Sequence, residues 1–384
     1  MNKEDAEKAA SLTEPKEEFP WLIRISRHFE ALSSEIIEGL ESTLVKRLGE
    51  EYALIKCRNT GRLVASDAAH FVRWNLPMDH AWPCNPQKME GFIEKAAQTL
   101  HEKFSGKGLQ GVFVGILDPS ARDGYYKALA TNLRGRTLQL FEDEAKGFRA
   151  VEEQDANKPS LFCMVGKEGL FCGVQSPRDS NGFYPGGTKF ISQNAPHTIS
   201  RAGAKIAEAL HYLPLHRPVP PDGGHWLELG ACPGGMSSEL LERGYEVTAI
   251  DRAPLDERLD KHRGLHFIKA DVAVFEPSAR ASFDALLCDM NGETRVALTQ
   301  VIRLSKNLKP GGLVVFTLKT AGVESYAEIN GHFKAAFDQA VTGWLKLVAV
   351  THLTYNRNEF TMFFERREGV EPRQGKGQGP GGHW

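Results

Sequence analysis

The sequence lacks the features that mark several large classes of protein. None of its six cysteines belongs to a C-x-x-C pair, so neither a zinc ribbon nor a disulfide framework is indicated, and we expect free thiols in a reducing compartment. No apolar run approaches the roughly 18 residues that a membrane-spanning helix needs. The charged amino terminus has no apolar core of the kind a signal peptide needs, which makes the cytoplasm the expected location.

Neither basic nor acidic residues are in marked excess. The chain carries 47 lysines and arginines against 49 aspartates and glutamates, a formal net charge of −2. Contact with nucleic acid would therefore depend on a local basic surface. A hydrophobic content of 41% is typical of a soluble globular protein, and 384 residues predict two or three domains.

Composition divides the chain into five regions. Residues 1–20 are highly charged and predict a disordered tail, whereas the Gly-rich residues 368–384 predict a flexible one. Between the tails we expect an α+β region over residues 21–180, a linker and helix over 181–224, and an α/β domain over 225–367. Within the α+β region, helices are expected near 35–48 and 87–105, and strands over 51–57, 69–74, 112–117, 161–165 and 170–174. The last two strands flank the turn GKEG and predict an antiparallel hairpin.

Residues 200–213 predict an amphipathic helix with Ser200 as its cap. Its apolar stripe follows the spacing i, i+3, i+4, i+7 and consists of Ile206, Ala209, Leu210 and Leu213. Arg201, Lys205 and Glu208 share its polar face. The Pro-rich segment 216–224 ends this helix.

After residue 224, short apolar runs alternate with helical stretches at 234–243 and 293–308. The runs cover residues 225–230, 246–251, 265–271, 283–289 and 313–319. This alternation indicates a largely parallel sheet with helices on both faces. Two further runs, 345–353 and 359–366, are separated by only five residues, which is too short for a parallel crossover, so they predict an antiparallel pair.

The strongest local motif is LELGACPGG (227–235), in which a strand leads into glycines that open a helix. A dinucleotide site prefers the spacing G-x-G-x-x-G, so G-x-x-x-G-G argues for S-adenosylmethionine instead. Three acidic residues end later strands and converge on the edge of the sheet where ligands bind. We expect the cofactor to contact Ser200, Glu228, Gly230, Cys232, Pro233, Gly234, Gly235, Met236, Asp251, Asp271 and Asp289. No base is paired with Cys232, which we interpret as a small packing residue and not a nucleophile.

Four segments together resemble a known family. LELGACPGG, CDM (288–290), KPGGLVVFTLK (309–319) and NEFTMFF (358–364) are similar to the FtsJ-type ribose 2′-O-methyltransferases of RNA. The resemblance covers residues 185–367 and is closest to the RlmM-type branch, which methylates a cytidine ribose of bacterial 23S ribosomal RNA. It implies a Rossmann-like methyltransferase sheet, preceded by an RNA-binding region that contains a THUMP domain, and residues 172–210 resemble the junction between the two.

The family uses a Lys-Asp-Lys-Glu tetrad. ISRAGAKIAEAL (199–210) is similar to the family's helix with the first lysine, so the resemblance implies that the catalytic residues are Lys205, Asp289, Lys319 and Glu359. We expect Lys319 to be the general base and Lys205 to hold the ribose or a phosphate. Asp289 would orient the base and the cofactor amine, and Glu359 would position a lysine or the ribose.

A ribose hydroxyl is a poor nucleophile, so something must remove its proton during transfer. A lysine can do this only when neutral, and neutralising an ordinary lysine at pH 7.4 costs about 4 kcal/mol. The cofactor sulfonium and a second lysine oppose the ammonium form of Lys319, whereas Asp289 and Glu359 favour it. The sequence leaves open which influence is larger.

RNA contacts are expected from side chains near the cleft. The basic candidates are Lys189, Arg201, Arg217, Arg357, Arg366 and Arg367, and the aromatic candidates for stacking on an unpaired base are Tyr184, Phe190 and Tyr355. The expected partner is RNA, with no membrane, DNA or metal ion, and the protein is expected to be a monomer. Two alternatives stay open: a catalytically silent RNA-binding or ribosome-assembly factor, and a methyltransferase of transfer RNA, an mRNA cap or a small molecule. The intact tetrad argues against a silent factor.

Overall fold

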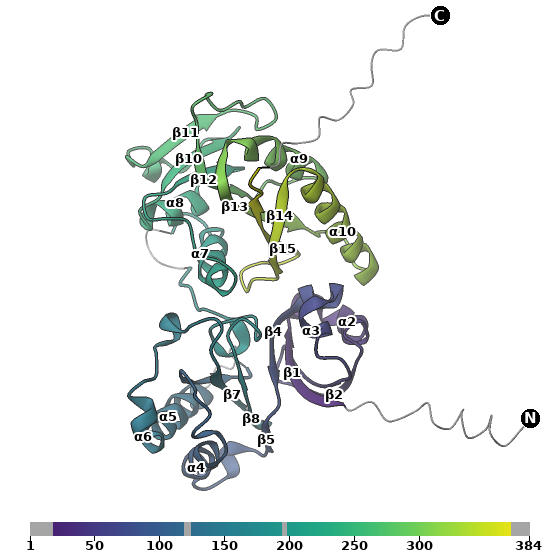
Figure 1. Ribbon diagram of the computed structural model, residues 1–384, viewed down its shortest axis with the longest axis vertical. Coiled ribbons are helices and arrows are strands. Elements are labelled where there is room, and N and C mark those ends of the chain that lie inside the picture. The colour runs from purple at the N-terminus through teal and green to yellow at the C-terminus, as the bar shows by residue number, and fades with distance from the viewer. Residues whose placement is uncertain (1–17, 119–123, 194–197, 370–384) are drawn as a thin grey trace, which may run out of the picture. The chain divides into compact units, whose positions relative to one another are not determined.

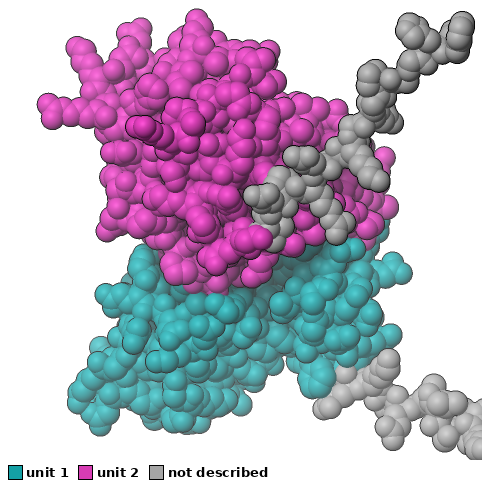
Figure 2. Space-filling model, turned by 45° about the horizontal axis from the view of Figure 1, so that its top comes forward, with its two compact units in different colours: residues 1–188 teal, residues 189–384 magenta. Residues whose placement is uncertain are grey.

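The computed structural model describes residues 18–118, 124–193 and 198–369, and the chain divides into two compact units, residues 1–188 and 189–384 (Figures 1 and 2). The predicted tails therefore lie almost wholly outside the described residues, although the first strand already begins at Phe19. Short 3₁₀ segments occur at Arg27–Leu32, Asp67–Phe71, Pro86–Lys88, Val151–Glu153, Pro185–Gly187, Leu213–Leu215, Glu257–Leu259 and Ser305–Asn307.

Unit 1 contains two four-stranded sheets. The first has the order β2-β3-β1-β4 and is antiparallel throughout, with β1 at Phe19–Ile25, β2 at Ser42–Leu48, β3 at Tyr52–Cys57 and β4 at Val72–Pro77. Two short helices accompany it, α2 (Ser33–Gly39) and α3 (Arg62–Ala65). The helix expected near 35–48 is wrong beyond residue 39. Residues 42–48 form an edge strand whose side chains are mostly exposed, so no alternation of polar and apolar residues marks it.

The second sheet has the order β5-β8-β7-β6, with β5 at His80–Pro83, β6 at Val112–Ile116, β7 at Ser160–Gly166 and β8 at Gly169–Gln175. The predicted antiparallel hairpin is confirmed, because β7 and β8 pair from Ser160↔Gln175 to Gly166↔Gly169. The apolar sides of α4 (Phe92–Phe104) and α5 (Tyr125–Leu140) form one core with this sheet, and α6 (Glu142–Ala145) follows them. Sequence reasoning found α4 but missed α5.

Residues 176–188 are held to the rest of unit 1 by hydrogen bonds from two buried arginine side chains. Arg24, 8% exposed, donates from Nη1 to the carbonyl oxygen of Gly186 at 2.7 Å. Arg73, 4% exposed, donates to the carbonyl oxygens of Asn181, at 3.1 Å, and of Gly187. The boundary between the two units falls after Thr188.

Unit 2 is built on one seven-stranded sheet with the order β11-β10-β9-β12-β13-β15-β14. The strands are β9 (His225–Leu229), β10 (Glu246–Asp251), β11 (Leu265–Lys269), β12 (Phe283–Cys288), β13 (Leu308–Lys319), β14 (Leu345–Thr351) and β15 (Glu359–Arg366). The first five in the sequence are parallel to one another, and β15 is antiparallel to β13 and β14. The largely parallel sheet and the antiparallel last pair are thus both confirmed.

Four helices accompany this sheet: α7 (Gly203–Tyr212), α8 (Gly235–Glu242), α9 (Thr294–Leu304) and α10 (Tyr326–Thr342). Gly203 lets α7 approach α8 closely, because a Cβ atom there would lie 2.8 Å from the carbonyl oxygen of Gly235. The expected cap is wrong, since α7 begins at Gly203 with Ala202 as its N-cap. Ser200 instead accepts the backbone N–H of Ala202 at 3.3 Å and closes a turn before the helix.

All six cysteines are free, as the absence of paired spacing predicted. Within the described ranges, no helix combines the length and the apolar character needed to cross a bilayer.

Candidate active site

Four charged side chains meet where strands of unit 2 begin or end. Lys205 lies on α7, Asp289 directly follows β12, Lys319 is the last residue of β13, and Glu359 is the first residue of β15. Because β13 and β15 run antiparallel, Lys319 and Glu359 stand directly opposite each other as Cα partners. The structure therefore brings together all four residues that the family resemblance implied.

The four side chains form a closed ring of alternating charge, which we call the charge ring. Lys205 Nζ lies 2.5 Å from Glu359 Oε1 and 3.2 Å from Asp289 Oδ2. Lys319 Nζ lies 2.5 Å from Asp289 Oδ1 and 2.8 Å from Glu359 Oε2. Each carboxylate thus uses one oxygen for each lysine.

The charge ring is shielded from water, since its side chains are only 10–19% exposed. Charges in such a setting interact more strongly than exposed surface pairs. Two positive and two negative charges balance, so each group is compensated by both neighbours. Removing one member would leave a partly buried charge without its full compensation.

The structure answers the question that the sequence left open about Lys319. Burial lowers the pKa of its ammonium group, but the negative charges of Asp289 and Glu359, together with their hydrogen bonds, raise it more. The net pKa of Lys319 is therefore raised above its ordinary value. In the protein without ligands, Lys319 is an ammonium ion at neutral pH.

The glycine loop between β9 and α8 packs closely against the rest of unit 2, and Gly234 and Gly235 are buried. Gly230 has φ +79° and Gly234 has φ +103°, a region that favours glycine. A Cβ atom on Gly235 would lie 2.1 Å from Ser200 Oγ, so this hydroxyl sits against the first turn of α8. The glycines therefore allow close packing at the start of α8, whereas Cys232 and Pro233 of the same loop are exposed and open to a ligand.

Two carboxylates accept hydrogen bonds from the backbone of loops at the same edge of the sheet as the glycine loop. Asp251, the last residue of β10, accepts the backbone N–H of Cys232 at 3.0 Å and that of Ala253 at 2.9 Å. Asp271 lies two residues beyond β11 and accepts the backbone N–H of Ala273 at 2.9 Å. Each oxygen keeps a lone pair for a second donor, such as a ribose hydroxyl.

Other expected cofactor residues differ widely in exposure. Glu228 is 2% exposed and accepts a hydrogen bond from Ser237 Oγ at 2.6 Å, and burial raises the pKa of its carboxyl to about 8. Met236 is also buried, whereas Pro233 is exposed. The interpretation of Cys232 as a packing residue is wrong, because its side chain is exposed. Partial burial and the charge of Asp251 raise the pKa of its thiol, which disfavours the nucleophilic thiolate.

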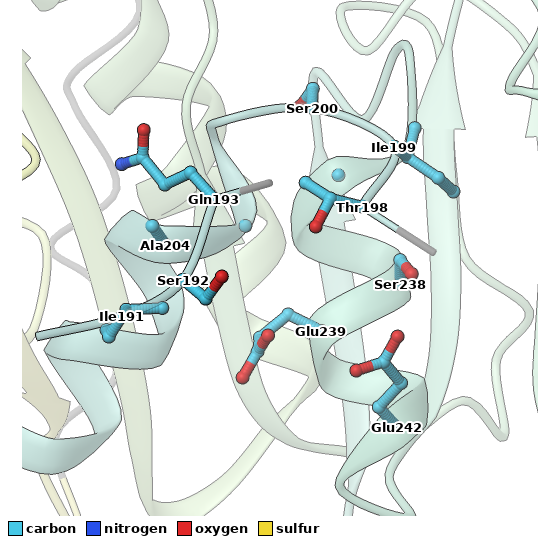
Figure 3. Close-up of a pocket in the computed structure, with 12 residues that line it drawn as sticks. Ile191, Ser192, Gln193, Thr198, Ile199, Ser200, Ala204, Ser238, Glu239 and Glu242 are labelled. Carbon is cyan, nitrogen blue, oxygen red and sulfur yellow. The ribbon is translucent and has the colours of Figure 1, made fainter. Parts of the chain in front are cut away.

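A small cavity lies beside the first turns of α7 and α8 (Figure 3). Its volume of about 50 Å³ leaves room for one or two water molecules. The lining comes from both helices and from the chain before α7, and includes Ile191, Ser192, Ser200, Ala204, Ser238 and Glu239. Sequence reasoning did not single out this wall of α8.

Sequence reasoning also missed a set of contacts around the connection between β14 and β15. Tyr355 Oη accepts the backbone N–H of Ile191 at 2.6 Å and donates to the carbonyl oxygen of the same residue at 3.0 Å. The N–H of Tyr355 donates to Glu208 Oε2 at 3.2 Å, and Glu208 is only 1% exposed. Asn356 donates to the carbonyl oxygen of Glu359 at 3.1 Å and fixes the turn into β15. No local sequence pattern signals contacts between such distant residues.

Some candidate RNA-binding residues already have partners within the protein, whereas Phe190 is exposed. Arg217 pairs with Glu365 at 2.9 Å, Arg366 donates to the carbonyl oxygen of Leu308, and Tyr184 donates to Glu152. These three side chains therefore hold the fold together. Phe190, in contrast, is 85% exposed.

Comparison with known proteins agrees with this geometry. Residues 198–340 match the family model described as FtsJ-like methyltransferase. The chain is 27% identical over 245 residues to the "Ribosomal RNA large subunit methyltransferase M" of Shewanella halifaxensis, which covers 62% of this chain and 66% of that protein. It is 41% identical over 100 residues to the protein of the same name from Halorhodospira halophila, which covers 26% of this chain and 28% of that protein.

The matches span just under two thirds of the length of the Shewanella protein and a smaller share of the Halorhodospira protein. Among solved structures, fibrillarin from Aeropyrum pernix with natively bound S-adenosyl-L-methionine aligns with 56% of this chain and 85% of that chain. Its sequence identity is 16% and its TM-score 0.33, a likeness too slight to carry an argument.

Proposed function

Because residues 198–340 match the family model described as FtsJ-like methyltransferase, we propose that this protein transfers a methyl group from S-adenosylmethionine to a ribose 2′-hydroxyl of 23S ribosomal RNA. The observation that carries the proposal is the charge ring of Lys205, Asp289, Lys319 and Glu359, which occupies strand ends of the sheet that also carries the glycine loop. Both relatives are named ribosomal RNA methyltransferases, which supports the choice of RNA.

The residues present suit the cofactor. The exposed part of the glycine loop, Cys232 and Pro233, would contact it at the start of α8, and the carboxylates of Asp251 and Asp271 would accept hydrogen bonds from its hydroxyl groups. When bound, S-adenosylmethionine supplies an electrophilic methyl group on a positively charged sulfur.

The charge ring supplies the proton chemistry in this proposal. Lys319 Nζ takes the proton from the ribose oxygen, which requires that Lys319 has first lost its own extra proton. Asp289 and Glu359 each bond to both lysines and so hold Lys319 Nζ in one place. Lys205 keeps its positive charge to bind the ribose or an adjacent phosphate.

This role for Lys319 predicts a pH dependence. Because the two carboxylates raise its pKa, only a small fraction of Lys319 is neutral at pH 7, and that fraction grows about tenfold for each pH unit below the pKa. We expect kcat/KM, which reports the free enzyme, to rise with pH with a slope near one on logarithmic axes. A rate independent of pH between about 6 and 9.5 would contradict base catalysis by a lysine with a raised pKa.

The activity itself is tested with tritiated S-adenosylmethionine and total RNA from cells that lack the gene. We expect label in 23S ribosomal RNA that stays in an alkali-resistant dinucleotide, because 2′-O-methylation blocks cleavage at that position. Label in transfer RNA alone would identify a different substrate. Label that alkali releases in mononucleotides would mean methylation of a base, and no label despite cofactor binding would favour a silent assembly factor.

We further propose that unit 1 is a THUMP-like RNA-binding region that presents the substrate, and that the protein acts as a monomer in the reducing cytoplasm. The free state of all six thiols supports that compartment.

A further inference from the structure

Residues 189–193, which we call the strap, precede α7 and lie beside it. Ile191 and Ser192 line the same small cavity as Ser200, Gly203 and Ala204, and Figure 3 shows the chain at Ile191 and Ser192 next to the helix that carries Ala204. Lys205, a member of the charge ring, is the residue after Ala204. The strap is therefore a near neighbour of the helix that supplies one of the two lysines.

Tyr355 fixes the strap at one residue, Ile191. Its hydroxyl both accepts from the N–H and donates to the carbonyl oxygen of Ile191, so the phenol must keep its proton to make both bonds. Burial raises the pKa of this phenol, the Ile191 bond lowers it, and the charge of Glu208 raises it further, with a net increase. At neutral pH the side chain is therefore a phenol, able to donate and accept.

Tyr355 is also linked to the two elements that carry Lys205 and Glu359. Its N–H donates to Glu208, which lies one helical turn after Lys205 on α7. Four residues after Tyr355 the chain reaches Glu359, with Asn356 bonded across the turn. The position of the strap is thus linked to the two elements that carry Lys205 and Glu359.

The residue before Ile191 has the most exposed large apolar side chain in the described part of the protein. Phe190 is 85% exposed, although both the N–H and the carbonyl oxygen of Ile191 are bonded to Tyr355. A flat aromatic ring held on a fixed backbone provides a surface on which a base of any sequence can stack. An unpaired base is the form in which proteins read single-stranded RNA segments.

We propose that Phe190 stacks on an unpaired RNA base next to the reacting ribose, and that Tyr355 and Glu208 are positioning residues that hold the strap, and Phe190 with it, against the helix that carries Lys205. The inference rests on the proposed function, because it names the surface that receives the RNA at the same site. It assigns Tyr355 to the support of the strap and not to stacking.

The first test is Phe190→Ala in the full-length protein, with steady-state kinetics on 23S ribosomal RNA. Loss of one stacked base is expected to raise KM for RNA by about 5- to 100-fold. The value of kcat and the affinity for S-adenosylmethionine should stay within about twofold of wild type, and Phe190→Tyr should restore KM, since a tyrosine ring also stacks. Val341→Ala, which trims a half-exposed apolar side chain on α10, serves as the matched control and should change nothing.

The second test separates support from stacking at Tyr355. Tyr355→Phe keeps the ring and removes both bonds to Ile191, so a raised KM for RNA supports a positioning role, whereas an unchanged KM overturns it. In the double variant Phe190→Ala/Tyr355→Phe, the second change should add little, because the side chain that Tyr355 positions is already gone. Fully additive effects would contradict the link between the two residues.

The outcomes distinguish this inference from the proposed function. If wild-type protein methylates no RNA, the proposed function fails. If wild-type protein is active and Phe190→Ala has the wild-type KM, only the stacking surface is refuted.

Discussion

Replacing Lys319 with alanine is expected to lower the rate of methyl transfer by about 10²- to 10⁴-fold, the range that a positioned general base contributes. Lys205, the other lysine of the charge ring, contacts the opposite oxygens of the same two carboxylates and remains in place. Binding of S-adenosylmethionine should survive, since the glycine loop lies in a separate part of the chain. Single-turnover transfer of label into RNA measures the rate, and titration calorimetry measures cofactor binding.

Two further variants make this prediction specific. Lys309→Ala removes a lysine from the other end of β13, where it pairs with Asp284 at 2.6 Å, and should leave transfer intact. Lys319→Arg keeps the positive charge but cannot lose its proton, so it should be as inactive as the alanine variant. Substantial activity of Lys319→Arg would show that the site needs a cation at this position and not a base.

Replacing Glu228 with glutamine is expected to make unit 2 more stable at alkaline pH. Burial raises the pKa of Glu228 from 4.5 to about 8, so between these values the folded protein holds a proton that the unfolded chain has lost. Stability therefore falls as pH rises across this window, by about 1.4 kcal/mol per pH unit for a single group. Glutamine has no proton to lose and can still accept from Ser237, so the variant should escape this fall.

Urea unfolding at pH 5, 6.5 and 8 tests this prediction. The difference in the free energy of unfolding between the variant and wild type should be small at pH 5 and reach a few kcal/mol at pH 8. Glu257→Gln, at an exposed position of the same unit, should show no such trend. A difference that stays constant with pH would mean that Glu228 ionises in the folded state as it does in the unfolded chain.

The predictions that held depend on patterns short enough to be read within one segment. Parallel strands, the hairpin of β7 and β8 and the antiparallel end of the sheet follow from apolar runs and from the lengths of the connections between them. The tetrad positions came from resemblance, and the register of β13 with β15 then places Lys319 and Glu359 opposite each other.

The predictions that failed depend on tertiary surroundings. Ser42–Leu48 forms a strand because β3 pairs with it, although its own residues show no alternation. Ser200 is a good capping residue in general, but its hydroxyl packs against Gly235 and accepts the N–H of Ala202 in a turn that precedes α7. The contact of Tyr355 with Ile191 joins residues 164 positions apart, which no local pattern can reveal.

The hydrogen bonds of the buried arginines of unit 1 determine where a fragment of the amino-terminal half can end. A fragment that stops at residue 180 would leave Arg24 and Arg73 without the carbonyl acceptors of Asn181, Gly186 and Gly187. An unsatisfied buried donor costs about 1–3 kcal/mol, and more when it is charged. Separate expression of the amino-terminal half should therefore retain the chain through Thr188, and a chimaera that exchanges this half should take the whole of residues 176–188 with it.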